Sequence, residues 1–392
     1  MIFPFHAAYY SRENRKCLEK LVVSDLDTAE HLWGSTDSSL AFRNVLVGST
    51  EHRGEMWQAW IAGGQVELSD TPSFYILNQE HEESAGRISR WAIFASIEIE
   101  SNLIYVHENV FPEGVERARQ STEACEGDMA PIFVGCSEDL GRAMRDFLQK
   151  WVIGKEPLLS MGEVEKSRIW KVEDAAAEES LQALFRNRGL YLLDGHHRLA
   201  AARENQRLGI GDGKILACIC SMEKDDTLIL PIHRIVHCDR WILQDAFVAD
   251  LIRAGCKVIE RLDIHPQNIA SALQRVPNGE PIAFALHAHS NRVLEVKFPT
   301  QYKQPESLAS LPVVALDFGI FHNLEKLTSI PVTDVNMALD QLAADQAQVA
   351  FFLAPLSAAQ VRTVARAGLK MPRKSTRFIP KPALGMLMRP WS

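Results

Sequence analysis

The feature that most constrains this chain is a short apolar run that passes through a glycine directly into a helical pattern. Tyr191–Leu193 forms the run, and Asp194, Gly195, His196, His197 and Arg198 follow it. Free N–H groups at a helix start, the positive end of the helix dipole and a glycine that permits close approach together suit an anion. Arg198 adds a planar grip on phosphate, and the histidines add further donors. The segment therefore predicts a strand–turn–helix phosphate site.

Two other interpretations of this segment remain open. In the first, Asp194 is only a helix N-cap, Gly195 an ordinary turn residue and Arg198 a solvated side chain. In the second, Asp194, His196 and His197 hold a metal. The second is disfavoured, because neighbouring helical residues point about 100° apart and no other histidine lies at ligand spacing.

His107 and Glu108 lie where an apolar strand ends, ahead of a charged helix that contains Arg117. A sheet positions a carboxylate at such a strand end while the loop leaves room for substrate, which suits acid or base chemistry. A solvated glutamate and a surface arginine are the ordinary alternatives for Glu108 and Arg117.

Two later segments also carry polar groups. Strand alternation places His233 and Arg234 on opposite faces of an apolar run, so at least one face needs water or a hydrogen-bond partner. A buried structural histidine is the default interpretation for His233. Lys374, Ser375 and Thr376 suit an anion, but the segment lacks the glycines of a phosphate loop.

Charge and cysteine usage exclude several classes of protein. The formal net charge of −8 and the pI of about 5.9 give no support to sequence-wide nucleic-acid binding, so an anion site must be local. The seven cysteines form no C-x-x-C pair, which favours reduced thiols in a cytoplasmic protein. Cys218 and Cys220 are expected on one strand face in the core. No secretion signal and no apolar run long enough to span a bilayer is visible.

The 392 residues predict two or three packed units, and the mixed periodicity predicts an α+β fold with regions at 1–90, 91–238 and 239–392. In the central region we expect strands at Trp91–Ile99, Asn102–Val106, Pro131–Val134, Ile169–Val172, Gly189–Leu193, Ile215–Ser221 and Leu228–Val236, and helices at Glu113–Ala124, Glu138–Val152, Asp174–Arg186 and His196–Leu208. In the last region we expect helices at Leu243–Ala254, Asn268–Gln274, Phe318–Leu327 and Ala358–Ala367, and strands at Pro281–Leu286, Val293–Lys297 and Val349–Leu353.

Taken together, the separated motifs resemble a family catalogued as a domain of unknown function, which is related to free serine kinases and more distantly to the ParB/sulfiredoxin-type fold. The matching positions are Pro4-Phe5, His107-Glu108 with Arg117, Pro131-Ile132-Phe133, Trp170, Asp194–Arg198, Leu230–Arg234, Met371–Pro382 and Gly385. The chain departs from the family in two places. Val22–Asp27 replaces a Pro-Pro-Tyr-Asp segment, which leaves the choice of substrate open, and Leu199 follows Arg198 where the family has tyrosine.

The resemblance implies a ParB/sulfiredoxin-like nucleotide-binding core with flanking N- and C-terminal α+β regions. It also implies a cytoplasmic kinase that transfers a phosphoryl group from ATP or ADP, with Mg²⁺, to free L-serine or a related hydroxyl amino acid. Glu108 would be the base, with Asp194 and His196 as catalytic partners. Gly195, His196, His197, Arg198 and Arg117 would bind the phosphates, and Asp194 would reach Mg²⁺ only through water. His107, His233, Arg234, Lys374, Ser375 and Thr376 would bind substrate or support the site.

Four alternatives remain. A ParB-like nucleotide switch would need a basic recognition helix, which residues 240–392 lack. A sulfiredoxin-like reductase would need a cysteine where His196 stands. The remaining two are a catalytically idle scaffold and a kinase for another biosynthetic hydroxyl substrate. The sequence leaves the donor, the pathway and the oligomeric state open, a homodimer included.

Overall fold

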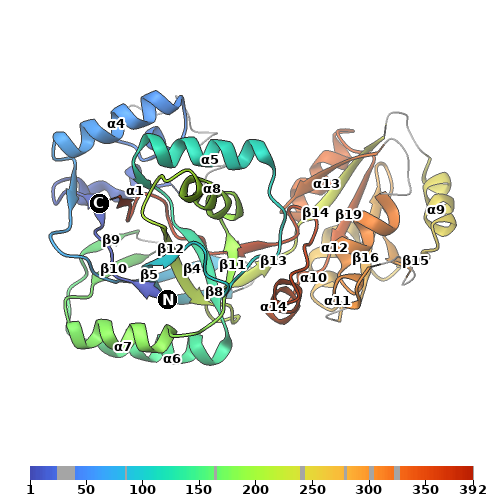
Figure 1. Cartoon of the computed structure of the whole chain (residues 1–392). Helices are drawn as coiled ribbons and strands as arrows, with labels where there is room; N and C mark the ends of the chain where they lie inside the picture. Colours follow the sequence, from blue (N-terminus) through green and yellow to red (C-terminus); the bar gives the residue numbers. More distant parts are fainter. Residues whose placement is uncertain are drawn as a thin grey trace. The chain divides into compact units, whose positions relative to one another are not determined.

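The computed structural model describes residues 1–23, 40–83, 86–162, 166–238, 243–277, 280–299, 304–321 and 327–391. They form two compact units (Figure 1). Unit 1 contains Met1–Val106, Val110–Leu228 and Pro380–Ser392, and unit 2 contains His107–Asn109 and Ile229–Ile379. The chain therefore contributes residues 107–109 to unit 2 and returns to unit 1 at residue 110. It passes into unit 2 again at residue 229 and returns to unit 1 at residue 380. The three-part division at residues 90 and 238 stays a prediction. Of the divergent segment 22–27, residues 24–27 lie outside the described residues.

Unit 1 is built on a mixed β-sheet. Its strand order is β6-β11-β8-β12-β5-β4-β10-β9, and β1 pairs with β5 beside this path. β11 runs antiparallel to β8, whereas β8 and β12 are parallel. The strands are β1 (Ile2–Phe3), β4 (Tyr75–Glu83), β5 (Gly86–Glu98), β6 (Ile104–Tyr105), β8 (Ile132–Cys136), β9 (Leu159–Met161), β10 (Ser167–Lys171), β11 (Leu190–Asp194) and β12 (Lys214–Ser221).

Helices cover both faces of this sheet. Figure 1 shows α6 and α7 on one side and α4, α5 and α8 on the other. Leu140, Met144 and Leu148 recur every four residues along α6 and are all buried in the core, as an amphipathic helix requires. The helical segments of unit 1 are η1 (Asn14–Cys17), α1 (Leu18–Leu21), α3 (Arg43–Leu46), α4 (Thr50–Ala62), α5 (Pro112–Ala124), α6 (Glu138–Trp151), α7 (Ala175–Phe185) and α8 (His196–Arg207).

The C-terminal segment of unit 1 packs along the N-terminal one. Leu384 and Met388 make backbone bridges to Val23 and Ala8. The short strand β21 (Arg389–Pro390) pairs with β7 (Gly127–Asp128), and β2 (Ala8–Tyr10) pairs with β3 (Val66–Leu68). The last residues of the chain are therefore part of the fold of unit 1.

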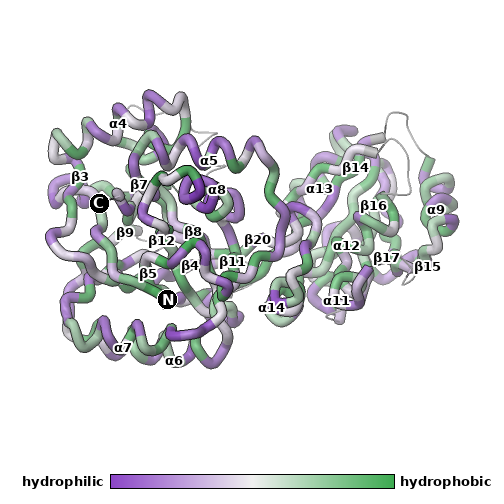
Figure 2. The backbone as a smooth tube through the Cα atoms, in the orientation of Figure 1, coloured by the Kyte–Doolittle hydropathy of each residue, from purple (hydrophilic) through white to green (hydrophobic). Residues whose placement is uncertain are grey.

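Unit 2 contains a second sheet, of order β15-β17-β16-β19-β14-β18, whose pairs are antiparallel. Phe284 and Phe352 pack with α10 and α13 in its core. Figure 2 shows the strands of both units in mostly hydrophobic colours. The elements are β13 (Leu228–Leu230), β14 (His233–Cys238), α9 (Gln244–Arg253), β15 (Lys257–Glu260), η2 (Pro266–Asn268), α10 (Ile269–Leu273), β16 (Ile282–His287), β17 (Leu294–Lys297), α11 (Glu306–Ala309), α12 (Pro312–Leu316), η3 (Asp317–Phe321), β18 (Leu327–Val332), α13 (Val335–Ala343), β19 (Val349–Leu353), α14 (Ala358–Arg366) and β20 (Arg377–Ile379).

The α+β prediction is confirmed, and two finer expectations need correction. The run Leu228–Val236 is not one strand, because Pro231 has no N–H to donate. It divides into β13, which pairs with β20, and β14, which lies in the sheet of unit 2. The strands expected at Trp91–Ile99 and Asn102–Val106 are present as β5 and β6. Of the helix expected at 318–327, the structure describes a π-helical turn up to Phe321 and a strand from Leu327.

The described residues also include six of the cysteines. Cys17, Cys125, Cys136, Cys218, Cys220 and Cys256 are free thiols, and Cys218 and Cys220 are fully buried. None of the helices in the described ranges combines the length and the hydropathy needed to cross a bilayer.

Candidate functional site

The predicted turn forms at the end of β11. Gly195 adopts the left-handed conformation, with φ 93° and ψ 26°, and is the N-cap of α8. A Cβ at this position would lie 2.9 Å from Cγ2 of Ile132 and 3.0 Å from Nε of Arg198, so only glycine fits without strain. Because the N-cap is glycine, no N-cap side chain competes for the first N–H groups of α8.

Asp194 is held between two cations instead of capping the helix. Its Oδ2 accepts a hydrogen bond from Nη2 of Arg198 at 2.9 Å, and its Oδ1 lies 3.2 Å from Nζ of Lys381. Burial alone would raise the pKa of Asp194, but the positive charges of Lys381 and Arg198 outweigh burial and hold that pKa well below its usual range. The carboxylate is therefore ionised and oriented.

His197 joins α8 to the start of α5. Its Nε2 accepts a hydrogen bond from the backbone N–H of Phe111 at 3.3 Å. The rings of His197 and Phe111 pack edge to face, with 4.2 Å between their centroids. A Cβ on Gly114 would lie 2.5 Å from Cδ2 of His197, so the glycine permits the contact. His196 is the first residue of α8 and is half-buried, whereas Arg117 is exposed on α5. Their phosphate-binding roles stay predictions.

The second candidate cluster lies in unit 2, around Glu108. Its Oε1 accepts a hydrogen bond from the backbone N–H of Ser375 at 3.3 Å. Beside it, Nε2 of the buried His107 lies 3.3 Å from Oγ1 of Thr376, and the N–H of Met371 donates to the carbonyl of His107 at 2.8 Å. The structure thus brings together residues that are more than 260 positions apart in the sequence.

Arg234 fixes the backbone that holds this cluster. Its Nη2 donates to the carbonyls of Lys374 at 2.9 Å and Arg373 at 3.2 Å. Burial lowers the pKa of Arg234, and the charges of Asp317 and Glu108 act in the opposite direction. Lys374 itself is exposed and has a positive φ of 56°. Arg234 is therefore placed to support the loop.

His233 points to the interior of unit 2. It is buried, and its Nδ1 accepts a hydrogen bond from the backbone N–H of Leu353 at 3.1 Å. The ring also packs against Phe352, with 5.5 Å between ring centroids. This is the structural histidine that the default interpretation expected.

A His233→Gln variant is expected to weaken the loss of stability in acid. Burial lowers the pKa of His233 to about 4, whereas an unfolded histidine titrates near about 6.5. The unfolded chain therefore binds more protons between these two values, so this histidine makes the free energy of unfolding fall by about 2 kcal/mol from pH 7 to pH 5. Urea unfolding at both pH values measures the slope.

The exposed His6 supplies the control for this measurement. A His6→Gln variant should keep the full decline between the two pH values, while the glutamine at position 233 still offers an oxygen to Leu353. Equal declines in wild type and His233→Gln would contradict the expectation.

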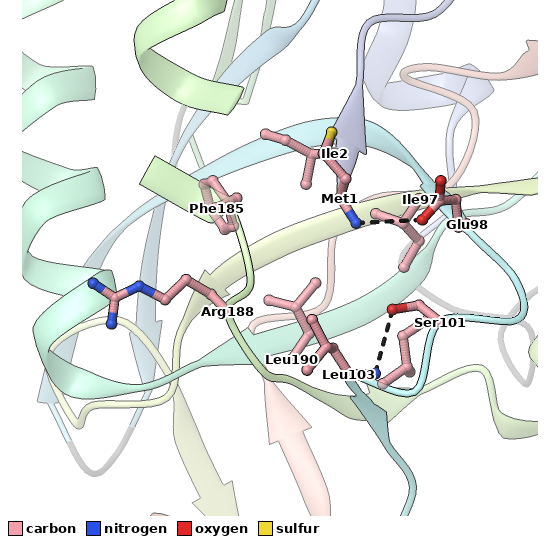
Figure 3. Close-up of a pocket in the computed structure, with 10 residues that line it drawn as sticks. Met1, Ile2, Ile97, Glu98, Ser101, Leu103, Phe185, Arg188 and Leu190 are labelled. Atoms are coloured by element: carbon pink, nitrogen blue, oxygen red, sulfur yellow. Dashed lines mark hydrogen bonds and ion pairs between the residues drawn. The ribbon is translucent and has the colours of Figure 1, made fainter. Parts of the chain in front are cut away.

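A separate pocket lies in unit 1 (Figure 3). Met1, Glu98, Phe185 and Arg188 line it together with apolar residues of β1, β5, β6 and β11. The N-terminal amine is 3.7 Å from the carboxylate of Glu98. None of the residues predicted for the functional site lines this pocket.

The described residues do not form a metal site of their own. No group of three or more His, Cys, Asp or Glu side chains within the described ranges is arranged to hold an ion. Both oxygens of Asp194 already face cations, which disfavours direct coordination of Mg²⁺. Asp194 is therefore unsuited to bind Mg²⁺ directly.

A comparison with protein families shows to which family this chain belongs. A family model described as "Protein of unknown function (DUF1015)" matches residues 44–317. The chain belongs to this family. The predicted resemblance to a family of unknown function is thus confirmed. No curated protein matches the chain.

Several solved structures match this DUF1015 chain at low identity. A free serine kinase variant in complex with AMP has 15% identity and a TM-score of 0.41, over 73% of this chain and 87% of that chain. A conserved hypothetical protein from Pyrococcus furiosus has 12% identity and a TM-score of 0.40, over 76% and 94%. C-terminally truncated SbnI from Staphylococcus aureus has 13% identity and a TM-score of 0.36, over 73% and 82%.

Sequence reasoning missed Lys381, which lies outside the matched range of the DUF1015 family. One signal was visible: Lys381 stands between Pro380 and Pro382, and prolines fix the backbone on both sides of a residue. Its partner Asp194 could not be inferred, because the contact joins distant parts of the sequence.

Proposed function

We propose that this DUF1015 chain is a small-molecule kinase. It transfers a phosphoryl group from ATP or ADP to the hydroxyl of free L-serine, or of a related hydroxyl amino acid, and gives O-phosphoserine in the case of serine. The observation that carries the proposal is the glycine turn into α8, with the ionised Asp194 between Lys381 and Arg198. A helix start with adjoining cations is suited to phosphate.

The turn supplies donors for the nucleotide phosphates. The first N–H groups of α8 and the positive end of its dipole attract the anion, and Gly195 lets it approach the backbone. Nε of Arg198 is buried and makes no hydrogen bond to the described residues. A buried donor of this kind needs a partner, and a phosphate oxygen would satisfy it.

Glu108 acts as the base in this proposal. It accepts the proton of the attacking hydroxyl as the new O–P bond forms and the bond to the leaving nucleotide breaks. The N–H of Ser375 orients its carboxylate, and the His107–Thr376 contact holds the adjacent backbone. Arg234 stabilises this arrangement through the carbonyl of Lys374.

The remaining predicted residues act on the substrates. His196, together with Arg117, contacts the phosphates and stabilises the transferring group, and His197 fixes α5 against α8. Mg²⁺ enters as part of the nucleotide substrate. Positioning and charge neutralisation account for most of the catalysis in phosphoryl transfer.

The test is a transfer assay with the whole protein. It is incubated with Mg²⁺, with ATP or ADP in turn, and with L-serine, L-threonine and L-homoserine, and phosphorylated products are followed by mass spectrometry. O-phosphoserine supports the proposal, and another phosphorylated acceptor redirects it to that substrate. Nucleotide hydrolysis without transfer would overturn it in favour of a ParB-like nucleotide switch.

A further inference from the structure

Lys381 lies outside the predicted motif but contacts Asp194, a residue of that motif. It follows Ile379, the last residue of β20, and belongs to unit 1. Its ammonium lies 3.2 Å from Oδ1 of Asp194, the carboxylate that also binds Arg198. A lysine from the C-terminal segment therefore stands at the turn where the phosphates of a nucleotide are proposed to bind.

The backbone of Lys381 is anchored by two buried polar side chains of the β4–β5 hairpin. Gln79 donates from Nε2 to the carbonyl of Lys381 at 3.0 Å. Arg90 donates to the carbonyl of Pro380 and to Oε1 of Gln79. Both side chains are almost fully inaccessible to solvent. The position of Lys381 is therefore set by the interior of unit 1.

Arg90 also adds positive charge beside Phe133, on the strand that pairs with β11. Its guanidinium lies over the ring of Phe133, 4.7 Å from the ring centroid, and Phe133 is the strand partner of Asp194. The hydrogen-bond partners of Arg90 are uncharged groups, which makes its burial costly. Arg90, Lys381 and Arg198 together exceed the charge of Asp194, in a chain whose formal net charge is −8. The turn is thus locally positive.

A purely structural role does not account well for the ion pair between Lys381 and Asp194. The side chains of Lys381 and Asp194 are 27% and 35% exposed, and a pair with this much solvent contact contributes little to stability. The C-terminal segment is already held by the bridges of Leu384 and Met388 and by Arg389. The segment does not need Lys381 to stay in place.

We infer that Lys381 is a phosphate-binding residue that contacts the terminal phosphates of the bound nucleotide, with Asp194 orienting its ammonium. Lysine is suited to this as a compact charge with three donors. Gln79 and Arg90 act as positioning residues through the backbone of residues 380 and 381. The inference rests on the proposed nucleotide-binding function.

Calorimetric titration of the whole protein with AMP, ADP, ATP and inorganic pyrophosphate tests this role. Lys381→Met keeps the length of the side chain and removes the charge. Its affinity for ADP, ATP and pyrophosphate should fall by about 10- to 100-fold, with a change of less than about threefold for AMP. Lys381→Arg should recover most of the affinity.

The control is Lys150→Met, which removes an exposed lysine of α6 and should bind all four ligands as the wild type does. An unchanged melting temperature of Lys381→Met separates a binding role from a structural one. Equal losses for AMP and ADP, no loss at all, or a wild type that binds none of the four ligands would overturn the inference.

The same proteins in the transfer assay separate this inference from the proposed function. Wild-type binding of ADP that depends on Lys381, without phosphorylation of any acceptor, supports the phosphate-binding role and overturns the kinase. Phosphorylation by Lys381→Met with wild-type affinity and rate supports the kinase and overturns the role of Lys381.

Discussion

Replacing Glu108 with glutamine is expected to lower kcat for phosphoryl transfer by about 10²- to 10⁴-fold, the range over which a general base contributes. Glutamine has the shape of glutamate, and its amide oxygen still accepts the N–H of Ser375 that binds Oε1 in the wild type. The variant therefore keeps the local contact and loses the ability to take a proton. Initial rates at saturating nucleotide and acceptor measure the effect.

The turn at Gly195, where the nucleotide is proposed to bind, belongs to a different part of the chain, so nucleotide binding should be spared. The Kd of ADP for Glu108→Gln is expected to stay within about threefold of the wild-type value. Glu113→Gln, which changes an exposed glutamate in the first turn of α5, is the matched control and should keep the wild-type rate. If Glu108→Gln keeps more than about one tenth of the wild-type kcat, Glu108 is not the base.

The strand–turn–helix around Gly195 could be predicted from the sequence because its parts are local. A buried strand, a glycine and a helix that starts at His196 are all contained in Leu190–Arg207, and their patterns have a period of only a few residues. α6 could likewise be predicted almost to the residue. The same local rules failed for Leu228–Val236, where Pro231 interrupts a run that otherwise has the composition of one strand.

The partners of the turn could not be predicted, because they come from distant segments. Gln79 and Lys381 are separated by 302 positions, and no periodicity connects such a pair. The segment Met371–Pro382 could be recognised by its resemblance to the family, but its contacts could not be predicted. In the structure its first part orients Glu108 in unit 2, and its last part places Lys381 in unit 1. The role of this segment depends on tertiary contacts, and sequence periodicity does not encode these contacts.

Replacing Arg389 with methionine is expected to lower the free energy of unfolding by about 3–5 kcal/mol, the cost of breaking a buried ion pair by removing one partner. Nη1 of Arg389 donates to Oδ2 of Asp128 at 2.8 Å, and the same oxygen accepts the N–H of Leu216. Arg389 also binds Asp212. Both Arg389 and Asp128 are buried, so methionine leaves an unpaired carboxylate inside unit 1. Urea unfolding at pH 7.5 measures the loss.

The pH dependence of this loss identifies its cause. Burial already raises the pKa of Asp128, and Arg389 counteracts burial, so the pKa rises further in the variant. A carboxyl group whose folded pKa is raised favours the folded state at low pH and loses that contribution as the pH rises through the folded pKa. The deficit of Arg389→Met relative to wild type should therefore shrink from pH 7.5 to pH 5.

Two further variants test whether the unpaired carboxylate of Asp128 causes the loss of stability. Asp128→Asn combined with Arg389→Met should recover part of the loss, because the amide carries no charge to bury. Arg142→Met removes an exposed pair with Glu138 on α6 and should cost less than about 1 kcal/mol. A loss for Arg389→Met no larger than that of Arg142→Met, or one independent of pH, would show that the C-terminal segment is held by its backbone bridges and apolar contacts, and that the ion pair with Asp128 contributes little.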